Sequence, residues 1–226
     1  MRILAIIPAF NEEECIKATV LELRRVCPEV DYVVINDGSR DKTSEILDEN
    51  NFNHVNLPIN TGLTSGFVTG MKYAARHKYD ATVQFDADGQ HRPGYIPDMA
   101  RAMEQQDADI VIASRGAAGS GAVGARGAGA KLLTALIKSA TGQTIKDPTS
   151  GMRMYNRKMI DLFTHAFDVS PEPDTISLLM RKGAKVIEVP AKMRERQGGA
   201  SYLRFWSSIS YMARTCISLI LFQWFR

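Results

Sequence analysis

The chain has 226 residues, of which 45% are apolar and 23% charged, the balance of a globular protein with a buried core. Its net charge of +3 is too small to indicate a nucleic-acid partner, and we expect none. Cys15, Cys27 and Cys216 form no CxxC pair, which favours reduced thiols in a cytoplasmic protein over a disulfide framework or a zinc site. The apolar runs are too short to predict a signal peptide or a spanning helix.

The first half of the chain alternates between apolar, β-rich runs and longer amphipathic stretches. In chain order we predict strand 2–8, helix 11–27, strand 31–36, turn 37–41, helix 42–50, strand 52–58, helix 62–77, strand 81–85, helix 93–106 and strand 109–114. This alternation predicts an α/β fold with a mostly parallel sheet and right-handed crossovers. In such sheets ligands bind at the carboxyl ends of the strands.

The second half is less regular. A Gly- and Ala-rich stretch, 115–131, is typical of a loop that enters a helix, and 147–160 predicts a loop, a short strand and the start of a helix. A further strand is expected at 185–190. No linker or repeat divides the chain, so we predict one catalytic domain, 1–201, followed by an extension, 202–226.

Two aspartates one residue apart occur twice in the sequence. Asp86 and Asp88, in "VQFDADGQHRP", follow a predicted strand, whereas Asp107 and Asp109, in "DADI", precede one. At the carboxyl edge two carboxylates repel each other unless a cation lies between them. Oxygen ligands suit Mg²⁺ or Mn²⁺, and Gln90 adds an amide oxygen nearby. We therefore expect a metal site at the first pair, and a connecting turn at the second.

Other polar residues also follow predicted strands. Asp37, before Gly38, suits a contact with a ribose hydroxyl or a base edge, or alternatively an Asx turn that caps the next helix. Glu12 either reaches a nucleoside or only favours a helix start. Arg115 follows the fifth strand, where it can face a phosphate.

Six stretches resemble family 2 glycosyltransferases of the GT-A fold. In order along residues 2–202 they are "IIPAFNEE", "VINDGSRDKT", "NTGLTSGFVTGM", "FDADGQHRP", "DPTSGMR" and "EVPAKMRERQGGAS". The chain is most similar to the branch that includes dolichol-phosphate mannose synthases and bacterial polyprenyl-phosphate glycosyltransferases. The resemblance implies an inverting transfer of a sugar from a nucleotide diphosphate, with UDP favoured, to a lipid phosphate.

The resemblance also implies roles for individual residues. Those expected to line the nucleotide-sugar site are Pro8, Phe10, Glu12, Asp37, Asp86, Arg115 and Ser201. Those expected to hold Mn²⁺ or Mg²⁺ are Asp86, Asp88 and Gln90. Those expected to serve the transfer step are Asp88, Arg126, Arg196 and Asp174. The family's Arg-x-x-Gly-x-Ser pattern often continues with Lys, which is Tyr202 here, so Arg194 or Arg204 is the candidate replacement.

The acceptor remains open between two classes. A lipid phosphate is already anionic and needs no base, whereas a glycan hydroxyl in cell-wall polysaccharide synthesis needs one, and Asp147, Glu172 and Asp174 are the candidates. Alternatively, Glu172 and Asp174 only stabilise a helix start between Pro171 and Pro173. A nucleotidyltransferase is disfavoured by the acidic "PAFNEEE" stretch, and a non-catalytic subunit of the same fold is a further alternative.

The extension, 202–226, is dense in apolar and aromatic residues and carries Arg204, Arg214 and Arg226. These features predict an amphipathic helix that lies in the membrane interface or binds a small membrane protein. We therefore expect a cytoplasmic protein that is peripheral at the inner face of the cell membrane. The alternative is a helix buried in the domain or in a homo-oligomer interface.

Overall fold

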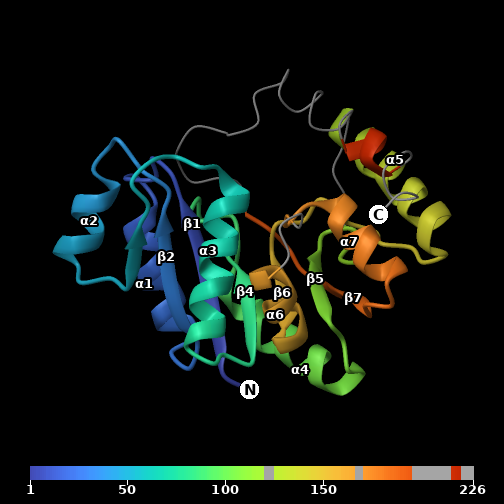
Figure 1. Cartoon of the computed structure of the whole chain (residues 1–226), viewed down its shortest axis with the longest axis horizontal. Helices are drawn as coiled ribbons and strands as arrows, with labels where there is room; N and C mark the ends of the chain where they lie inside the picture. The colour runs from blue at the N-terminus through green and yellow to red at the C-terminus, as the bar shows by residue number, and fades with distance from the viewer. Residues whose placement is uncertain (120–124, 166–169, 195–214, 220–226) are drawn as a thin grey trace.

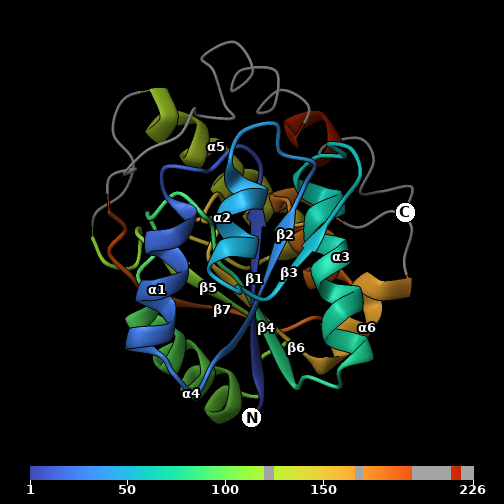
Figure 2. The ribbon, with the colours of Figure 1, turned by 90° about the vertical axis from the view of Figure 1, so that its left-hand side faces the viewer.

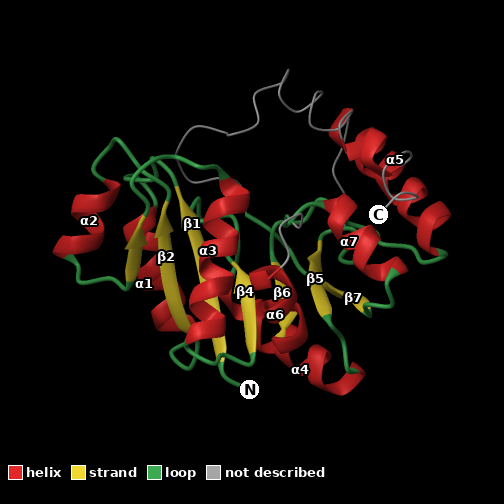
Figure 3. Ribbon diagram, viewed as in Figure 1, coloured by secondary structure: helices red, strands yellow, loops and turns green. Residues whose placement is uncertain are grey.

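The structure is a computed structural model that describes residues 1–119, 125–165, 170–194 and 215–219 (Figure 1). In this part of the chain, seven strands form one sheet in the order β3-β2-β1-β4-β6-β5-β7 (Figure 3). The strands are β1 (Ile3–Ala9), β2 (Asp31–Asn36), β3 (His54–Asn56), β4 (Ala81–Gln84), β5 (Ile110–Ser114), β6 (Arg153–Asn156) and β7 (Val186–Pro190). All neighbours pair in parallel except β6, which is antiparallel to both β4 and β5.

Helices cover both faces of the sheet. Their bounds are α1 (Ile16–Val26), α2 (Thr43–Glu49), α3 (Leu63–Arg76), the 3-10 turn η1 (Pro93–Tyr95), α4 (Ile96–Gln106), α5 (Ala125–Thr141), α6 (Arg157–His165) and α7 (Pro173–Arg181). Apolar side chains of α1, α2 and α4 pack in one core cluster, and those of α3, α5, α6 and α7 pack in a second. Figure 2 shows α1 and α4 on one side of the sheet and α3 and α6 on the other.

The strand β1 shows why the sheet is central. Its residues alternate between the two core clusters, with Ile3, Ala5 and Ile7 in one and Leu4 and Ile6 in the other. Because both faces are buried, the strand needs a continuous apolar run rather than an alternating pattern. The prediction of a doubly covered strand at 2–8 is confirmed, with a shift of one residue.

The helix predicted over 11–27 begins later, at Ile16. Asn11 has a positive φ of 55°, which ends the extended backbone in a turn instead of a helix. The amide of Asn11 donates to Ser39 Oγ at 3.0 Å, and the amide of Glu12 donates to Thr43 Oγ1 at 2.9 Å. Residues 11–15 are therefore used to join the ends of β1 and β2 before the helix starts.

Only one turn of the predicted extension, 215–219, lies within the described residues, and it is helical. Leu219 is buried in the core cluster formed with α5 and α7, and Ser218 Oγ donates to Asp174 Oδ2 at 2.7 Å. Ile217 is exposed. This turn therefore packs against the rest of the fold, as the alternative for the extension predicts, and the interfacial helix stays a prediction.

In the described part of the chain, no helix has the length and apolar character needed to cross a membrane.

The contact between α3 and β1 gives a test of the packing. A Cβ on Gly70 would lie 2.3 Å from Ile6 Cγ2, whereas a Cβ on Gly66 would have its nearest neighbours at 3.8 Å and 3.9 Å. We expect Gly70→Ala to lower the free energy of unfolding by about 1–3 kcal/mol, because the buried, β-branched Ile6 has no room to move.

The matched variant Gly66→Ala sits on the same helix and should be neutral or stabilising by up to about 1 kcal/mol, since alanine favours a helix. Urea unfolding of both variants measures the difference. Equal stabilities would contradict the close packing of α3 on β1.

Candidate active site

The carboxyl edge of the sheet collects most of the residues that the sequence singled out. Glu12, Asp37 and Asp86 follow the adjacent strands β1, β2 and β4. Arg115 follows β5, on the far side of β6. Because β6 is antiparallel, the loop before it, 147–151, enters at this same edge. The reversed strand thus places a second loop between the aspartates and Arg115.

Asp86 and His91 form the first part of the site. The amide of Asp86 donates to His91 Nδ1 at 2.9 Å, so a neutral ring carries its proton on Nε2, which lies 3.5 Å from Asp86 Oδ2. His91 is buried, while the side chain of Asp86 is 34% exposed. The imidazole therefore orients Asp86.

Gly151 sets the distance between the 147–151 loop and Asp86. A Cβ at this position would lie 2.8 Å from Asp86 Oδ2 and 3.5 Å from His91 Nε2. Any other residue would displace the carboxylate, so glycine is required by the close approach. The sequence analysis assigned Gly151 no role of its own, because the contact depends on the antiparallel register of β6.

Asp88 and Gln90 lie in the turn after Asp86. Asp88 is buried, and its Oδ1 accepts a hydrogen bond from the amide of Gln90 at 3.0 Å. The side-chain nitrogen of Gln90 donates to the carbonyl of Arg194 at 3.4 Å. That bond commits the nitrogen end of the amide, and the oxygen end is the one suited to a cation.

The donor set fits a hard divalent ion. No group of three or more His, Cys, Asp and Glu side chains suited to a metal occurs in the described residues. The oxygen donors in this turn are the carboxylates of Asp86 and Asp88 and the side-chain amide of Gln90. Carboxylate and amide oxygens are the ligands that Mg²⁺ and Mn²⁺ prefer, and such ions complete their shell with phosphate and water. Asp86, Asp88 and Gln90 would therefore hold the ion.

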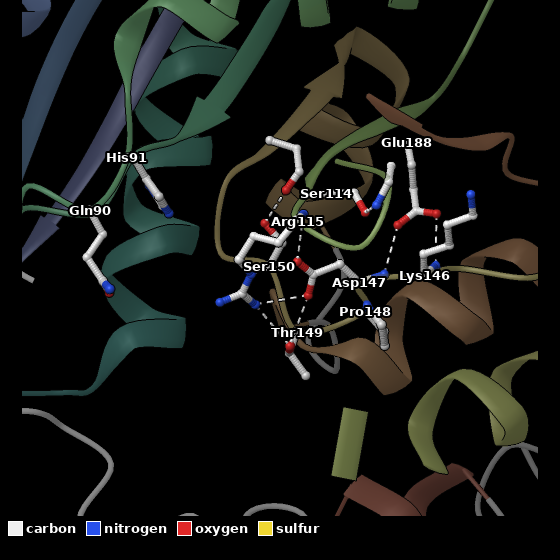
Figure 4. Close-up of polar contacts among 12 residues, drawn as sticks. Gln90, His91, Ser114, Arg115, Lys146, Asp147, Pro148, Thr149, Ser150 and Glu188 are labelled. Atoms are coloured by element: carbon white, nitrogen blue, oxygen red, sulfur yellow. Dashed lines mark hydrogen bonds and ion pairs between the residues drawn. The ribbon is translucent and has the colours of Figure 1, made fainter. Parts of the chain in front are cut away.

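Arg115 and Asp147 form a bidentate ion pair beside this turn (Figure 4). Arg115 Nε lies 2.7 Å from Asp147 Oδ2, Nη2 lies 2.9 Å from Oδ1, and the Arg115 amide adds a bond of 3.0 Å to Oδ2. Thr149 Oγ1 donates to Asp147 Oδ1 at 3.1 Å. Behind the pair, the Glu188 carboxylate accepts from the amides of Lys146 and Asp147, both at 2.8 Å.

This pairing bears on Asp147 as a candidate base. Burial alone would raise the pKa of Asp147, but the hydrogen bonds and the charge of Arg115 outweigh burial and lower the pKa. A carboxylate held in this way is a weak proton acceptor at neutral pH. Of the three candidate bases, Asp147 is therefore the least suited to remove a proton from a hydroxyl.

Asp37 shapes the other end of the edge. Its carboxylate accepts bonds of 2.8 Å from the amide and the hydroxyl of Thr61 and from the amide of Gly62. A Cβ on Gly38, which has a φ of +66°, would lie 2.5 Å from the backbone of Ile59. The turn after β2 is thus bound to the loop after β3. The Asx turn at the start of the next helix is made instead by Asp41, whose Oδ1 accepts a hydrogen bond from the amide of Thr43.

A polar groove of about 380 Å³ lies beside this turn, lined by Asn36, Gly38, Ser39, Arg40, Ser44, Asn56, Leu57, Pro58, Ile59 and Asn60. Its volume is within the range of small-ligand sites. A groove of the same volume lies around Asp31 and Tyr79 at the amino ends of the strands, far from the expected ligand edge. We favour the first groove for a nucleoside because it adjoins Asp37. Pro8 and Phe10 are half-buried at the end of β1.

The second aspartate pair behaves as a connection. Asp107 ends α4 with a left-handed φ of 48°, and Asp109 accepts from the amide of Lys185 at 2.9 Å and from Asn156 Nδ2 at 2.9 Å. Burial raises the pKa of Asp109, but these bonds outweigh burial and lower it. The prediction that this pair precedes a strand and only joins elements is confirmed.

The remaining expected residues have mixed outcomes. Glu172 precedes α7 and Asp174 lies in its first turn, next to Pro173, as the structural alternative predicts, but Glu172 makes no side-chain capping bond to the helix. Arg194 forms a bidentate pair with Glu22 at 2.7 Å, and its use in place of the family's lysine stays a prediction. Arg196, Ser201 and Arg204, and the side chain of Arg126, lie outside what the structure describes.

The comparisons with known proteins agree with this arrangement. The family model described as "Glycosyl transferase family 2" matches residues 4–163. The chain belongs to glycosyltransferase family 2. It is therefore an enzyme of the transferase class, as the sequence motifs predict.

Two curated relatives of this family 2 glycosyltransferase have names that combine mannose, phosphate and a polyprenyl lipid. An undecaprenyl-phosphate mannosyltransferase of Micrococcus luteus is 31% identical over 217 residues, which covers 89% of this chain and 87% of the relative. A polyprenol monophosphomannose synthase of Mycolicibacterium smegmatis is 30% identical over 215 residues, which covers 88% of this chain and 80% of the relative.

Among solved structures, a glucosyl-3-phosphoglycerate synthase of Mycobacterium tuberculosis in complex with phosphoglyceric acid matches with a TM-score of 0.73 at 18% identity, covering 97% of this chain and 79% of that chain. The same enzyme in complex with Mn²⁺, uridine diphosphate and phosphoglyceric acid matches with a TM-score of 0.70 at 17% identity, covering 96% and 78%. At these identities the likeness shows the fold alone, and the expected GT-A fold is confirmed.

The Arg115–Asp147 pair of this glycosyltransferase can be tested by stability. We expect Asp147→Asn to lower the free energy of unfolding by about 1–3 kcal/mol at pH 7, because Arg115 loses a buried anionic partner. The pKa of Asp147 is lowered in the folded state, so the charge stabilises the fold above the unfolded pKa of about 4. That stabilisation is lost as the pH falls through the folded pKa.

The difference in the free energy of unfolding between wild type and Asp147→Asn should therefore be largest at pH 7 and shrink below about pH 4. Urea unfolding at both pH values measures it. Asp161→Asn is the matched control, because it breaks the exposed pair with Arg157 on α6 and should cost at most about 0.5 kcal/mol. An Asp147→Asn variant as stable as this control would contradict a structural role for the pair.

Proposed function

We propose that this enzyme transfers a hexose or an N-acetylhexosamine from a nucleotide diphosphate sugar, with UDP favoured, to a polyprenyl phosphate, with inversion at the anomeric carbon. The observation that carries the proposal is the oxygen-ligand set Asp86, Asp88 and Gln90 at the carboxyl edge of the sheet. Support for the acceptor comes from the two relatives named above, whose chains are covered almost in full. Support for UDP and Mn²⁺ comes from the complexes of the synthase with the same fold.

The residues divide the work along the edge. The groove beside Asp37 would take the nucleoside. Pro8, Phe10 and Glu12 lie at the end of β1, the strand next to β2, and would meet the nucleotide from there. A divalent ion, Mn²⁺ or Mg²⁺, would offset the negative charge that grows on the leaving diphosphate. Asp147 fixes the orientation of Arg115 (Figure 4). The guanidinium of Arg115 would add positive charge beside the diphosphate.

The described residues favour a phosphate acceptor over a hydroxyl. An ionised phosphate oxygen attacks without losing a proton, whereas a hydroxyl needs a general base. The pKa of Asp147 is lowered by Arg115, and Asp174 accepts a hydrogen bond from Ser218 in the packed turn 215–219. Asp174 thus has a structural partner at the start of α7. Transfer to a phosphate requires neither Asp174 nor Glu172 as a base.

The place of action follows from the acceptor. A polyprenyl phosphate keeps its chain in a bilayer and its phosphate at the surface, so the enzyme must work at the membrane interface. We propose that it acts as a peripheral protein at the inner face of the membrane, where nucleotide sugars are made. The exposed Ile217 and the arginines of 202–226 support contact with lipid or with a small membrane protein.

The two aspartate pairs give a matched test of the metal site. We expect Asp88→Asn to reduce transfer by at least about 100-fold, because the loss of one charged ligand weakens the binding of the ion and of the diphosphate that it contacts. Asp107→Asn changes the same residue type in the copy at the amino edge, where asparagine also tolerates the left-handed backbone, and should keep full activity. Transfer is measured as labelled sugar that enters an organic phase with polyprenyl phosphate and Mn²⁺.

If the wild-type enzyme keeps its full transfer rate in excess chelator, or if the two variants are equally active, a metal site at Asp86 and Asp88 is contradicted.

The acceptor class is tested by the residues around α7. We expect Glu172→Gln and Asp174→Asn each to lose less than about tenfold in kcat, since loss of a general base usually costs 10²–10⁴-fold. Steady-state kinetics with polyprenyl phosphate provide the measurement, and circular dichroism checks the fold. A loss in the larger range for either variant would favour a base and the glycan-hydroxyl alternative.

A further inference from the structure

The segment 191–194, which follows β7, crosses the candidate site as an extended strap. The amide of Ala191 donates to the carbonyl of Ser114 at 3.1 Å, and the amide of Lys192 donates to Tyr95 Oη at 3.0 Å. The strap is thus bound to the end of β5 and to the turn before α4. Its last residue, Arg194, reaches the turn that contains Gln90.

Arg194 and Gln90 are joined by two hydrogen bonds. The amide of Arg194 donates to the carbonyl of Gln90 at 3.0 Å, and Gln90 Nε2 donates to the carbonyl of Arg194 at 3.4 Å. These bonds fix both the backbone and the side-chain amide of Gln90. A Gln side chain has three rotatable bonds, so this partner reduces the number of orientations that its amide can adopt.

The side chain of Arg194 anchors the strap to α1. Its Nη1 and Nη2 donate to Glu22 Oε2 and Oε1, both at 2.7 Å, which is the parallel two-bond geometry of the strongest Arg–carboxylate pairs. The hydrogen bonds from Arg194 lower the pKa of Glu22. Glu22 lies far from Gln90 in sequence, on α1. The same helix also contacts the turn after β4, because Thr19 Oγ1 donates to the carbonyl of Ala87 at 2.9 Å.

We propose that Glu22 and Arg194 are positioning residues that hold Gln90 as the third ligand of the divalent ion. The inference rests on the proposed function, and it adds two residues that do not themselves touch the ion. Groups that orient a metal ligand without touching the metal typically change metal affinity by 10–100-fold when removed. If the pair served stability alone, its removal would leave the metal affinity unchanged. Its effect on stability should also be small, because partly exposed ion pairs contribute little to the free energy of folding.

The experiment measures Mn²⁺ affinity by titration calorimetry in the presence of UDP, so that no transfer is needed for the readout. The proteins are wild type, Arg194→Ala, Glu22→Gln and the control Arg157→Ala. The control breaks another bidentate-capable Arg–carboxylate pair, with Asp161 on α6, away from the carboxyl edge. Thermal unfolding in chelator and hydrogen exchange of the 191–194 segment are measured on the same metal-free samples.

We expect Arg194→Ala to raise the Kd for Mn²⁺ by at least about tenfold and Glu22→Gln by several-fold, with faster exchange in 191–194. The control should stay within about twofold of wild type. A charge-reversed Glu22→Arg, Arg194→Glu double variant should recover part of the affinity lost by Arg194→Ala, because it restores the pair.

An unchanged Kd in Arg194→Ala and Glu22→Gln, or an equal loss in Arg157→Ala, would overturn the positioning role while the proposed function stands. Failure of the wild-type protein to bind Mn²⁺ with UDP would instead overturn the metal-dependent function itself. If Arg194→Ala does not fold, Glu22→Gln decides the question, since it keeps the size of the side chain.

Discussion

The site depends on the reversal of one strand. Because β6 runs antiparallel between β4 and β5, the loop that precedes it reaches the carboxyl edge instead of the amino edge. There Gly151 lies against the Asp86 carboxylate, and Asp147 pairs with Arg115. If β6 ran parallel to its neighbours, the loop before it would lie at the amino edge and both contacts would be lost.

The carboxylates at this edge have different partners, and those partners separate their roles. Asp147 is neutralised by Arg115, and Asp37 is fixed by the Thr61–Gly62 turn. Asp86 keeps about a third of its side-chain surface exposed beside the buried Asp88. Two carboxylates this near in sequence repel each other unless a cation or a proton intervenes. The edge thus brings two carboxylates into one turn, which suits an ion that also binds a diphosphate.

Part of this arrangement could be predicted from the sequence, because the succession of strands and helices along the chain and the positions of the strand ends follow from local patterns. The apolar run at β1 and the position of Asp86 after β4 depend on neighbouring residues only. The start of α1 could not be predicted, because Asn11 is held by Ser39, which is distant in sequence. The roles of Gly151 and Arg194 depend on the register of β6 and on the path after β7, which no periodic pattern encodes.

The most direct measurement is to offer the purified enzyme a labelled nucleotide sugar, Mn²⁺ and equal amounts of a polyprenyl phosphate and the matching free polyprenol. A phosphate nucleophile needs no base, so we predict that label enters only the polyprenyl phosphate. Labelling of the free alcohol, or of a soluble glycan in preference to both lipids, would contradict transfer to a lipid phosphate.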